Sequence, residues 1–238
     1  MDGRAALVTG GSSGIGLAIA RALGEDGYRL TVSARRPDKL DDAVSGLTAD
    51  GIEAHAVAAN MADEDAIRNV VEAHRERYGR LDVLINNAGV GIGAPIAEAE
   101  TRKLDIQLGV NLRGVYLTLR ECIPMLKEAG AEHRKALVVN TASIAGVRGQ
   151  GWLSMYSATK AGVIALSQAA HMELSNDGIQ VTAFAPGFVD TPMTDWVEGQ
   201  VPRDQMIRPA DLAEAVRFLL RTSPACIVPE LRFIRPGE

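Results

Sequence analysis

Short apolar runs alternate with longer segments of helical period along the chain, and this alternation constrains the fold more than any other feature. Most of the short runs are continuously apolar, which is typical of strands that helices cover on both faces. Strands are expected at Ala5–Thr9, Arg29–Ser33, Glu53–Ala58, Val83–Asn86, Ala136–Asn140, Gln180–Ala185 and Leu231–Ile234. Helices are expected at Gly14–Glu25, Asp38–Asp50, Asp63–Tyr78, Thr101–Lys127, Tyr156–Leu174 and Pro209–Leu220. The pattern predicts an α/β fold with a doubly wound parallel sheet of about seven strands.

The length and charge of the chain exclude several classes of protein. Its 238 residues lie within the size range of one α/β domain, so we expect residues 1–238 to form a single domain. The formal net charge of −5 is small, and acidic and basic residues are mixed along the chain. This pattern favours neither a nucleic-acid nor a membrane partner. Met1–Arg4 leads directly into an apolar run without the regions of a signal peptide. We therefore expect a soluble, cytoplasmic protein.

The cysteines and histidines show no ligand spacing. Cys122 and Cys226 are far apart in the chain, and the histidines lack the paired spacing of metal ligands and hydrolase triads. We predict neither a metal site nor a disulfide framework.

The segment 186–208 lacks a regular period and contains three prolines and two glycines. Long loops in compact domains are more often functional than not. We therefore expect a substrate lid at about residues 186–208. Its Trp196 is either a core anchor or a cover over the substrate.

A glycine-rich turn follows the first expected strand and opens the first expected helix. It comprises Gly10, Ser12, Ser13, Gly14, Ile15 and Gly16. Such a turn directs free backbone N–H groups and the positive end of the helix dipole at an anion, and its missing side chains let a pyrophosphate approach. Gly16 would also let the helix pack closely against the strand. The spacing departs from the general dinucleotide motif, and the glycines also fit a tight turn without a ligand.

The residues after the second expected strand favour a phosphorylated dinucleotide. A carboxylate at this position, about 20 residues beyond the glycines, usually binds the ribose hydroxyl of NAD(H). Here the chain has Arg35 and Arg36, whose forked donors match a phosphate. The pair predicts NADP(H) rather than NAD(H), although two solvated charges in a loop would give the same sequence.

Tyr156 and Lys160 stand four residues apart, which places them on one face of the expected helix. A nearby positive charge favours the ionised phenol, so the pair is suited to exchange a proton with a carbonyl or alcohol oxygen. Ser143 follows the strand Ala136–Asn140, at the sheet edge where sites form. Its hydroxyl would orient the same oxygen, or cap a turn. A serine hydrolase is excluded because Ser143 lacks the Gly-x-Ser-x-Gly motif and a base.

These residues jointly resemble the short-chain dehydrogenases/reductases of the NADP-preferring type, over nearly the whole chain. The motifs that carry the resemblance are residues 9–16 (Thr-Gly-Gly-Ser-Ser-Gly-Ile-Gly), residues 86–89 (Asn-Asn-Ala-Gly), Asn111, Ser143, Tyr156 with Lys160, and Pro186-Gly187 with Thr191. The resemblance implies a Rossmann-type domain that binds a nicotinamide cofactor.

The resemblance also implies a role for each catalytic position. Tyr156 would be the general acid in reduction and the base in oxidation, and Lys160 would bind the nicotinamide ribose. Ser143 would polarise the substrate oxygen, and Asn111 would support a water-linked proton relay to Lys160. The implied NADP(H) site comprises Gly10, Ser12, Ser13, Gly14, Ile15, Gly16, Arg35, Arg36, Asn60, Met61, Asn87, Ala88, Gly89, Tyr156, Lys160, Pro186, Gly187, Val189 and Thr191.

The chain departs from the family pattern at two places. Asn60 stands where the family usually has Asp, and an amide oxygen is also able to accept a hydrogen bond from the adenine amino group. The C-terminal tail 229–238 is short and lacks the usual ending, which bears on the last strand and on one subunit interface.

We expect an oxidoreductase that transfers a hydride between NADPH and a ketone, or the reverse with a secondary alcohol. A 3-oxoacyl thioester reductase and a non-catalytic NADP(H)-sensing binding protein are the alternatives. Gly91 and Gly93 would leave space for the substrate. The expected apolar pocket wall comprises Ala145, Val147, Leu153, Phe188, Met193 and Trp196. The nearly apolar helix Tyr156–Leu174 predicts a partner subunit on its outer face, hence a homodimer or homotetramer.

Overall fold

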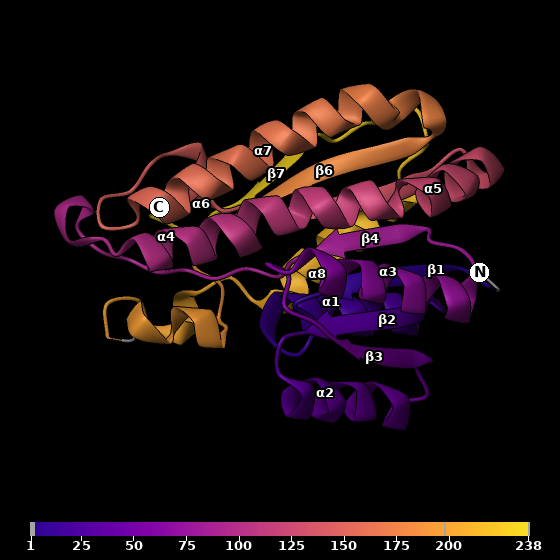
Figure 1. The fold of residues 1–238 in the computed structure, drawn as a ribbon, viewed down its shortest axis with the longest axis horizontal. Helices are drawn as coiled ribbons and strands as arrows, with labels where there is room; N and C mark the ends of the chain where they lie inside the picture. The colour runs from indigo at the N-terminus through magenta and orange to yellow at the C-terminus, as the bar shows by residue number, and fades with distance from the viewer. Residues whose placement is uncertain (1–2, 198, 238) are drawn as a thin grey trace.

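Seven parallel strands form one sheet in the order β3-β2-β1-β4-β5-β6-β7. The computed structural model describes residues 3–197 and 199–237, so both ends of the predicted domain and residue 198 of the predicted lid lie outside the described residues. The strands are β1 (Ala5–Thr9), β2 (Arg29–Ala34), β3 (Ala54–Ala58), β4 (Val83–Asn86), β5 (Ala136–Thr141), β6 (Ile179–Pro186) and β7 (Glu230–Phe233). The predicted fold class is confirmed, and Figure 1 shows the helices packed around the sheet.

Helices cover both faces of the sheet. One face carries α1 (Gly14–Glu25), α2 (Pro37–Ala49) and α8 (Pro209–Arg221). The other carries α3 (Glu64–Tyr78), α5 (Gly114–His133) and α7 (Ser154–Leu174). Among the described residues, no helix is both long enough and apolar enough to cross a membrane.

The sheet separates two apolar cores, and β1 contributes to both. All five residues of β1 are buried. Val8 belongs to the core beneath α1, α2 and α8, whereas Leu7 belongs to the core beneath α3, α5 and α7. Because successive side chains of a strand point to opposite faces, a strand covered on both sides needs an unbroken apolar run, which is the pattern that the sequence shows.

The connections reverse direction at β1, which lies between β2 and β4. From β1 the chain proceeds outward through β2 to β3, and it then returns to the opposite side of β1 as β4. The loops that leave β1 and β4 therefore diverge from one another. In open parallel sheets, this point at the carboxyl ends of the strands is where ligands bind.

The expected uninterrupted helix Thr101–Lys127 is wrong in extent and regularity. The structure has α4 (Thr101–Leu108), a π-helical turn η2 (Gly109–Arg113) and then α5 (Gly114–His133). Within the π-turn, the Asn111 amide makes hydrogen bonds with both backbone groups of Val90. A Cβ added to Gly114 would lie 2.3 Å from the carbonyl oxygen of Met61. These contacts join segments far apart in the sequence, so the helical period does not reveal the π-turn.

The C-terminal tail supplies the last strand despite its shortness. β7 lies one residue before its expected position and pairs in parallel with β6. The rings of Phe184 and Phe233 lie 5.1 Å apart, and Phe233 accepts a hydrogen bond from the N–H of Gly187 at 2.8 Å. The tail thereby holds the beginning of the segment that follows β6. The short elements are η1 (Ile96–Glu98), α6 (Ile144–Val147), η3 (Ser175–Asp177), η4 (Pro192–Val197) and η5 (Arg203–Gln205).

Candidate active site

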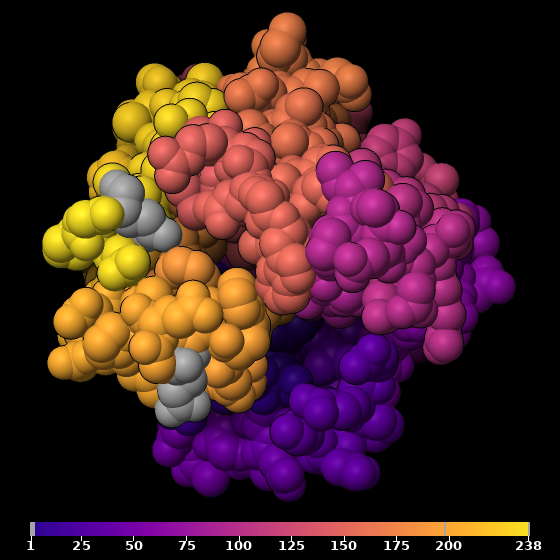
Figure 2. Space-filling model, turned by 90° about the vertical axis from the view of Figure 1, so that its left-hand side faces the viewer, coloured from indigo at the N-terminus to yellow at the C-terminus, as the bar shows by residue number. Residues whose placement is uncertain are grey.

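A cavity of about 580 Å³ opens at the carboxyl ends of the strands, a size typical of small-molecule sites. Figure 2 shows the hollow between the indigo N-terminal part and the orange segment that includes the predicted lid. The cavity brings together every predicted cofactor position except Gly16. Those that line it are Gly10, Ser12, Ser13, Gly14, Ile15, Arg35, Arg36, Asn60, Met61, Asn87, Ala88, Gly89, Tyr156, Lys160, Pro186, Gly187, Val189 and Thr191.

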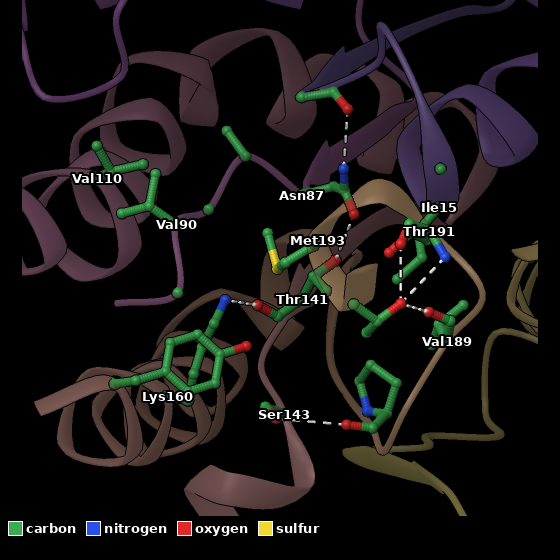
Figure 3. Close-up of a pocket in the computed structure, with 18 of the residues that line it drawn as sticks. Ile15, Asn87, Val90, Val110, Thr141, Ser143, Lys160, Val189, Thr191 and Met193 are labelled. Carbon is green, nitrogen blue, oxygen red and sulfur yellow. Dashed lines mark hydrogen bonds between the residues drawn. The ribbon is translucent and has the colours of Figure 1, made fainter. Parts of the chain in front are cut away.

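The glycine turn after β1 packs directly against the motif after β4. Gly10 has a φ of 66°, in the region that favours glycine. A Cβ added to Gly10 would lie 2.8 Å from the Cα of Ala88. Asn87 Nδ2 donates a hydrogen bond to the carbonyl oxygen of Gly10 at 3.1 Å, as Figure 3 shows. Each segment therefore fixes the position of the other.

Gly16 lies behind the cavity and has a packing role. A Cβ added there would lie 2.4 Å from the carbonyl oxygen of Gly10. Helix α1 begins at Gly14, and the preceding Ser13 makes no capping hydrogen bond with its side chain. Because the first N–H groups of a helix lack partners within the helix, the beginning of α1 presents free donors beside the cavity.

Arg35 and Arg36 follow β2, and both have exposed side chains on the cavity. Elsewhere in the described chain arginines form ion pairs, for example Arg217 with Asp26 at 3.0 Å. Neither Arg35 nor Arg36 forms one with any residue that the structure describes. Their guanidinium groups are therefore available to an anionic ligand. Asn60, at the end of β3, uses its Oδ1 to accept the N–H of Ala62 at 3.2 Å.

Ser143 caps the short helix α6 just after β5. Its Oγ accepts a hydrogen bond from the N–H of Ala145 at 3.2 Å and donates one to the carbonyl oxygen of Pro186 at 3.4 Å (Figure 3). Ser143 also lines the cavity. Ser143 is thus able both to cap α6 and to face the cavity, because the hydrogen bond from Ala145 holds its hydroxyl on the cavity wall.

Lys160 is 3% exposed and lies in α7, on the floor of the cavity. Its Nζ donates a hydrogen bond to the carbonyl oxygen of Thr141 at 2.6 Å (Figure 3). The same Nζ lies 5.8 Å from the centre of the Tyr156 ring. Burial lowers the pKa of Lys160 to about 8, so the side chain is mostly an ammonium at neutral pH.

The pKa of Tyr156 differs from the sequence-based expectation. Burial raises the pKa of the Tyr156 phenol above its ordinary value of 10, and the neighbouring Ser143 hydroxyl only partly offsets the rise. Loss of water around the phenol is the largest influence on this pKa, and the expected lowering of the pKa by the Lys160 charge is not found. The phenol is protonated at neutral pH, which suits donation of a proton to a carbonyl oxygen.

The buried ammonium makes the stability of the fold depend on pH. The folded pKa of Lys160, about 8, is below the unfolded value of 10.5, so between these pH values the unfolded chain holds a proton that the folded chain has released. The free energy of unfolding should rise across this window by about 3 kcal/mol from this group, at about 1.4 kcal/mol per pH unit. The free energy of unfolding of Lys160→Met, measured with urea at several pH values, should lack this part of the rise. Parallel curves for the two proteins would contradict it.

Asn111 lies behind the cavity wall rather than on it. The side chain is fully buried, and its Oδ1 accepts the N–H of Val90 while its Nδ2 donates to the Val90 carbonyl, both at 2.8 Å. Nδ2 also donates to Thr159 Oγ1 at 3.2 Å. The added Cβ of Gly89 would lie 3.4 Å from Lys160 Nζ and 3.5 Å from Asn111 Oδ1. Asn111 therefore positions the segment beside Lys160, and the proposed water relay stays a prediction.

The predicted pocket wall is largely assembled, with one exception. Ala145, Leu153, Phe188, Met193 and Trp196 line the cavity, together with Gly91 and Gly93. Val147 does not. It stands two residues after Ala145 on the single turn of α6, so its side chain points to another side of the helix.

The sequence analysis assigned no role to Thr9, which begins the motif 9–16, and it missed Thr141 and Trp152. Thr9 Oγ1 accepts the N–H groups of Asn87 and Ala88, at 3.1 and 3.2 Å. Thr141 supplies the carbonyl that Lys160 contacts. A hydroxyl at the last position of a strand was the available signal for both threonines. Trp152 lines the cavity with a positive φ of 65°, which no local pattern indicates.

Helix α6 packs backbone to backbone against α7, and Gly146 makes this approach possible. A Cβ added to Gly146 would lie 2.5 Å from the backbone carbon of Lys160. Gly146→Ala should therefore lower the free energy of unfolding by about 1–3 kcal/mol and also lower turnover, because Ser143 precedes α6. Gly149→Ala is the matched control, since nothing lies within 4 Å of its added Cβ. Equal stability of the two variants would contradict the prediction.

The cavity residues fit a phosphorylated dinucleotide. The glycine turn provides backbone donors without side chains, and the unpaired Arg35 and Arg36 lie at the neighbouring strand end. A Cβ added to Gly14 would lie 2.8 Å from Thr191 Cγ2, so the segment after β6 closes directly over the turn. Phosphate donors, a small-residue cradle and a cover are all present in the described chain.

Comparisons with known proteins agree over nearly the whole chain. The short chain dehydrogenase family model matches residues 4–201. The 3-oxoacyl-[acyl-carrier-protein] reductase FabG of Staphylococcus aureus is 34% identical over 225 residues, which cover 91% of this chain and 90% of that protein.

Solved structures resemble the whole fold. A variant of the actinorhodin polyketide ketoreductase with NADPH superposes with a TM-score of 0.88 at 34% identity, covering 97% of this chain and 95% of that one. The 3-ketoacyl-(acyl-carrier-protein) reductase of Brucella melitensis, complexed with NADH, has a TM-score of 0.88 at 32% identity, with 97% and 96% covered. Both nicotinamide cofactors thus occur among the relatives.

Proposed function

The chain belongs to the short-chain dehydrogenase family of oxidoreductases, and from this membership we propose that it is an NADPH-dependent carbonyl reductase. The same site run in reverse would oxidise a secondary alcohol. One observation carries the proposal: Ser143, Tyr156 and Lys160 lie on one cavity whose lining also includes Arg35 and Arg36.

The cofactor would be held along the carboxyl edge of the sheet. Arg35 and Arg36 would bind the phosphate on the adenosine ribose, and the glycine turn with the beginning of α1 would bind the pyrophosphate. Lys160 would donate to the hydroxyls of the nicotinamide ribose. When bound, NADPH supplies the hydride.

The chain's own residues would supply and guide the proton. Ser143 Oγ would turn its proton from the Pro186 carbonyl to the carbonyl oxygen of the substrate, which holds that oxygen beside Tyr156. The protonated phenol of Tyr156 would then give its proton to this oxygen. The Lys160 ammonium would stabilise the phenolate that results, since an opposite charge nearby favours the ionised form.

Reduction of a 3-oxoacyl thioester is the second candidate. The relatives that favour it are named 3-oxoacyl-[acyl-carrier-protein] reductases. The same Ser143, Tyr156 and Lys160 would act on the keto group, so the two candidates differ only in what the outer part of the cavity binds. Turnover of a 3-oxoacyl thioester at a far higher kcat/KM than any simple ketone would favour this candidate.

The segment 186–208 is proposed as the lid over the substrate. Its apolar residues form a small core of their own, made by Phe188, Val197, Val201 and Met206. Arg203 forms ion pairs with Asp190 and Asp195 within the same segment. Because Val189 and Ile207 pack against the core of the sheet, the part of the segment between them would move as one unit.

A second subunit is proposed to cover the outer face of α7. Ala161, Ala165 and Met172 are exposed on this helix, and Met172 is 78% exposed. Burial of this face would remove apolar surface from water. Mass measurement in solution should give a dimer or tetramer, and a monomer at micromolar concentration would contradict this assembly.

The proposed function is tested by titrating the purified protein with NADPH and with NADH, followed by a panel of ketones. We expect tighter binding of NADPH and consumption of NADPH with a ketone substrate. Binding without turnover of any carbonyl compound would support a sensing protein instead. Binding of neither cofactor would overturn the proposal.

A further inference from the structure

Both tryptophans of the chain lie at the cavity, although they come from separate segments. Trp152 precedes α7 and Trp196 belongs to the lid. Their ring centres lie 5.3 Å apart, and the Phe188 ring lies 6.3 Å from that of Trp196. All three line the cavity. We call Trp152, Trp196 and Phe188 the aromatic wall.

The backbone holds Trp152 in an unusual conformation. A positive φ of 65° is rare for a bulky residue and is costly, and such residues concentrate at ligand sites. The conformation is secured by a hydrogen bond from the N–H of Ala94 to the Trp152 carbonyl at 2.8 Å. A Cβ added to Gly93 would lie 2.3 Å from the Trp152 ring. The fold therefore holds this ring directly against the backbone at Gly93.

The segment Gly91–Gly93 connects the aromatic wall to the reacting centre. A Cβ added to Gly91 would lie 3.8 Å from the Tyr156 ring, and two residues of chain span at most about 7 Å. Gly91 thus lies beside the Tyr156 ring and Gly93 beside the Trp152 ring, which places the aromatic wall close to the reacting centre. A group two or three bonds from the substrate carbonyl would reach the wall.

The wall is left half open, and the charged residues that line the cavity belong to its other sites. Trp152 and Trp196 are each 50% exposed, so a large aromatic surface faces the cavity mouth and solvent. The charged residues among those that line the cavity are Arg35, Arg36 and Lys160, all of which belong to the proposed cofactor and proton-transfer sites. A neutral, flat group would therefore cover the wall without desolvating a charge.

We propose that the substrate is a ketone with a neutral aromatic ring that packs against the aromatic wall while its carbonyl meets Ser143 and Tyr156. This inference rests on the proposed reductase function and adds the substrate class. Aromatic rings gain from stacking and edge-to-face contacts beyond the area that they bury, and a saturated ring of the same size does not.

The test compares benzylacetone with its ring-hydrogenated cyclohexyl analogue. The two ketones share the same carbonyl environment because the ring is separated from it, so their intrinsic reactivity is matched. With NADPH, kcat/KM should be about tenfold higher for benzylacetone. Trp152→Leu and Trp196→Leu should each remove most of this preference, because kcat/KM for benzylacetone should fall further than kcat/KM for the cyclohexyl ketone. Phe218→Leu, which alters an exposed ring on α8, should leave the preference unchanged.

A second measurement requires no variant. Because Trp152 and Trp196 are the chain's two tryptophans, fluorescence of the wild-type protein that is excited selectively at tryptophan reports on these two rings of the aromatic wall. Benzylacetone should quench it at lower concentration than the cyclohexyl analogue does. Equal quenching together with equal kcat/KM would overturn the inference and leave the proposed function standing. Selective quenching, with no reduction of either ketone or of any member of the ketone panel, would support the aromatic site and overturn the proposed function.

Discussion

Replacing Tyr156 with Phe should lower kcat/KM for carbonyl reduction by about a thousandfold, since positioned general acids contribute roughly 10²–10⁴-fold. The substitution removes the phenol proton and leaves the ring that lies 5.8 Å from Lys160 Nζ. Packing should therefore persist, and NADPH affinity should change by less than about threefold, because the phenol is not among the proposed phosphate contacts.

The measurement is steady-state NADPH oxidation with an active ketone, alongside direct titration of NADPH binding. Tyr116→Phe is the matched control, because Tyr116 is 52% exposed on α5 and lies outside the cavity lining. Retention of turnover in Tyr156→Phe would refute the proposed proton donor. Loss of both turnover and NADPH binding would instead indicate structural damage, which a far-ultraviolet spectrum and the unfolding midpoint would reveal.

The double substitution Arg35→Ala with Arg36→Ala should weaken NADPH binding by about a hundredfold and leave NADH binding within about twofold. Charge-assisted hydrogen bonds contribute about 1.5 kcal/mol or more each, and two of them would be lost. Both side chains are exposed, so their removal should not alter the free energy of unfolding by more than about 0.5 kcal/mol.

Cofactor titrations at fixed ionic strength check this second expectation, with Arg221→Ala at the end of α8 as the control for loss of a distant surface arginine. The control should bind NADPH like the wild type, because a distant surface charge is screened. An equal loss of NADPH and NADH affinity in the double variant would show that the arginines do not read the ribose phosphate. Unchanged NADPH affinity would remove the basis for assigning NADPH.

The chain's strongest sequence signals are those that depend only on local geometry. A strand followed by a glycine turn and a helix is read directly from residues 9–16, and the structure places this turn on the cavity. Tyr156 and Lys160 share a helix face because they are four residues apart. Arg35 and Arg36 are found because a parallel sheet presents all its strand ends at one edge.

Other features depend on contacts between distant segments. The π-turn at Asn111 arises where the Asn111 amide binds Val90, and the same contact holds Asn111 behind the wall of the cavity. Trp152 is fixed by Ala94 and Gly93, which lie about sixty residues earlier in the printed sequence. No helical or strand period carries information of this kind.

The sequence by itself determined the α/β class, the strands and the motifs at their ends, because period and apolar content reflect how each segment is buried. Only the tertiary structure decided the pKa direction of Tyr156, since the sequence shows the Lys160 charge but not the loss of water around the phenol. It also decided which side chains form the aromatic wall. Burial and the approach of distant segments are properties of the packed chain, so they emerge only when the elements meet.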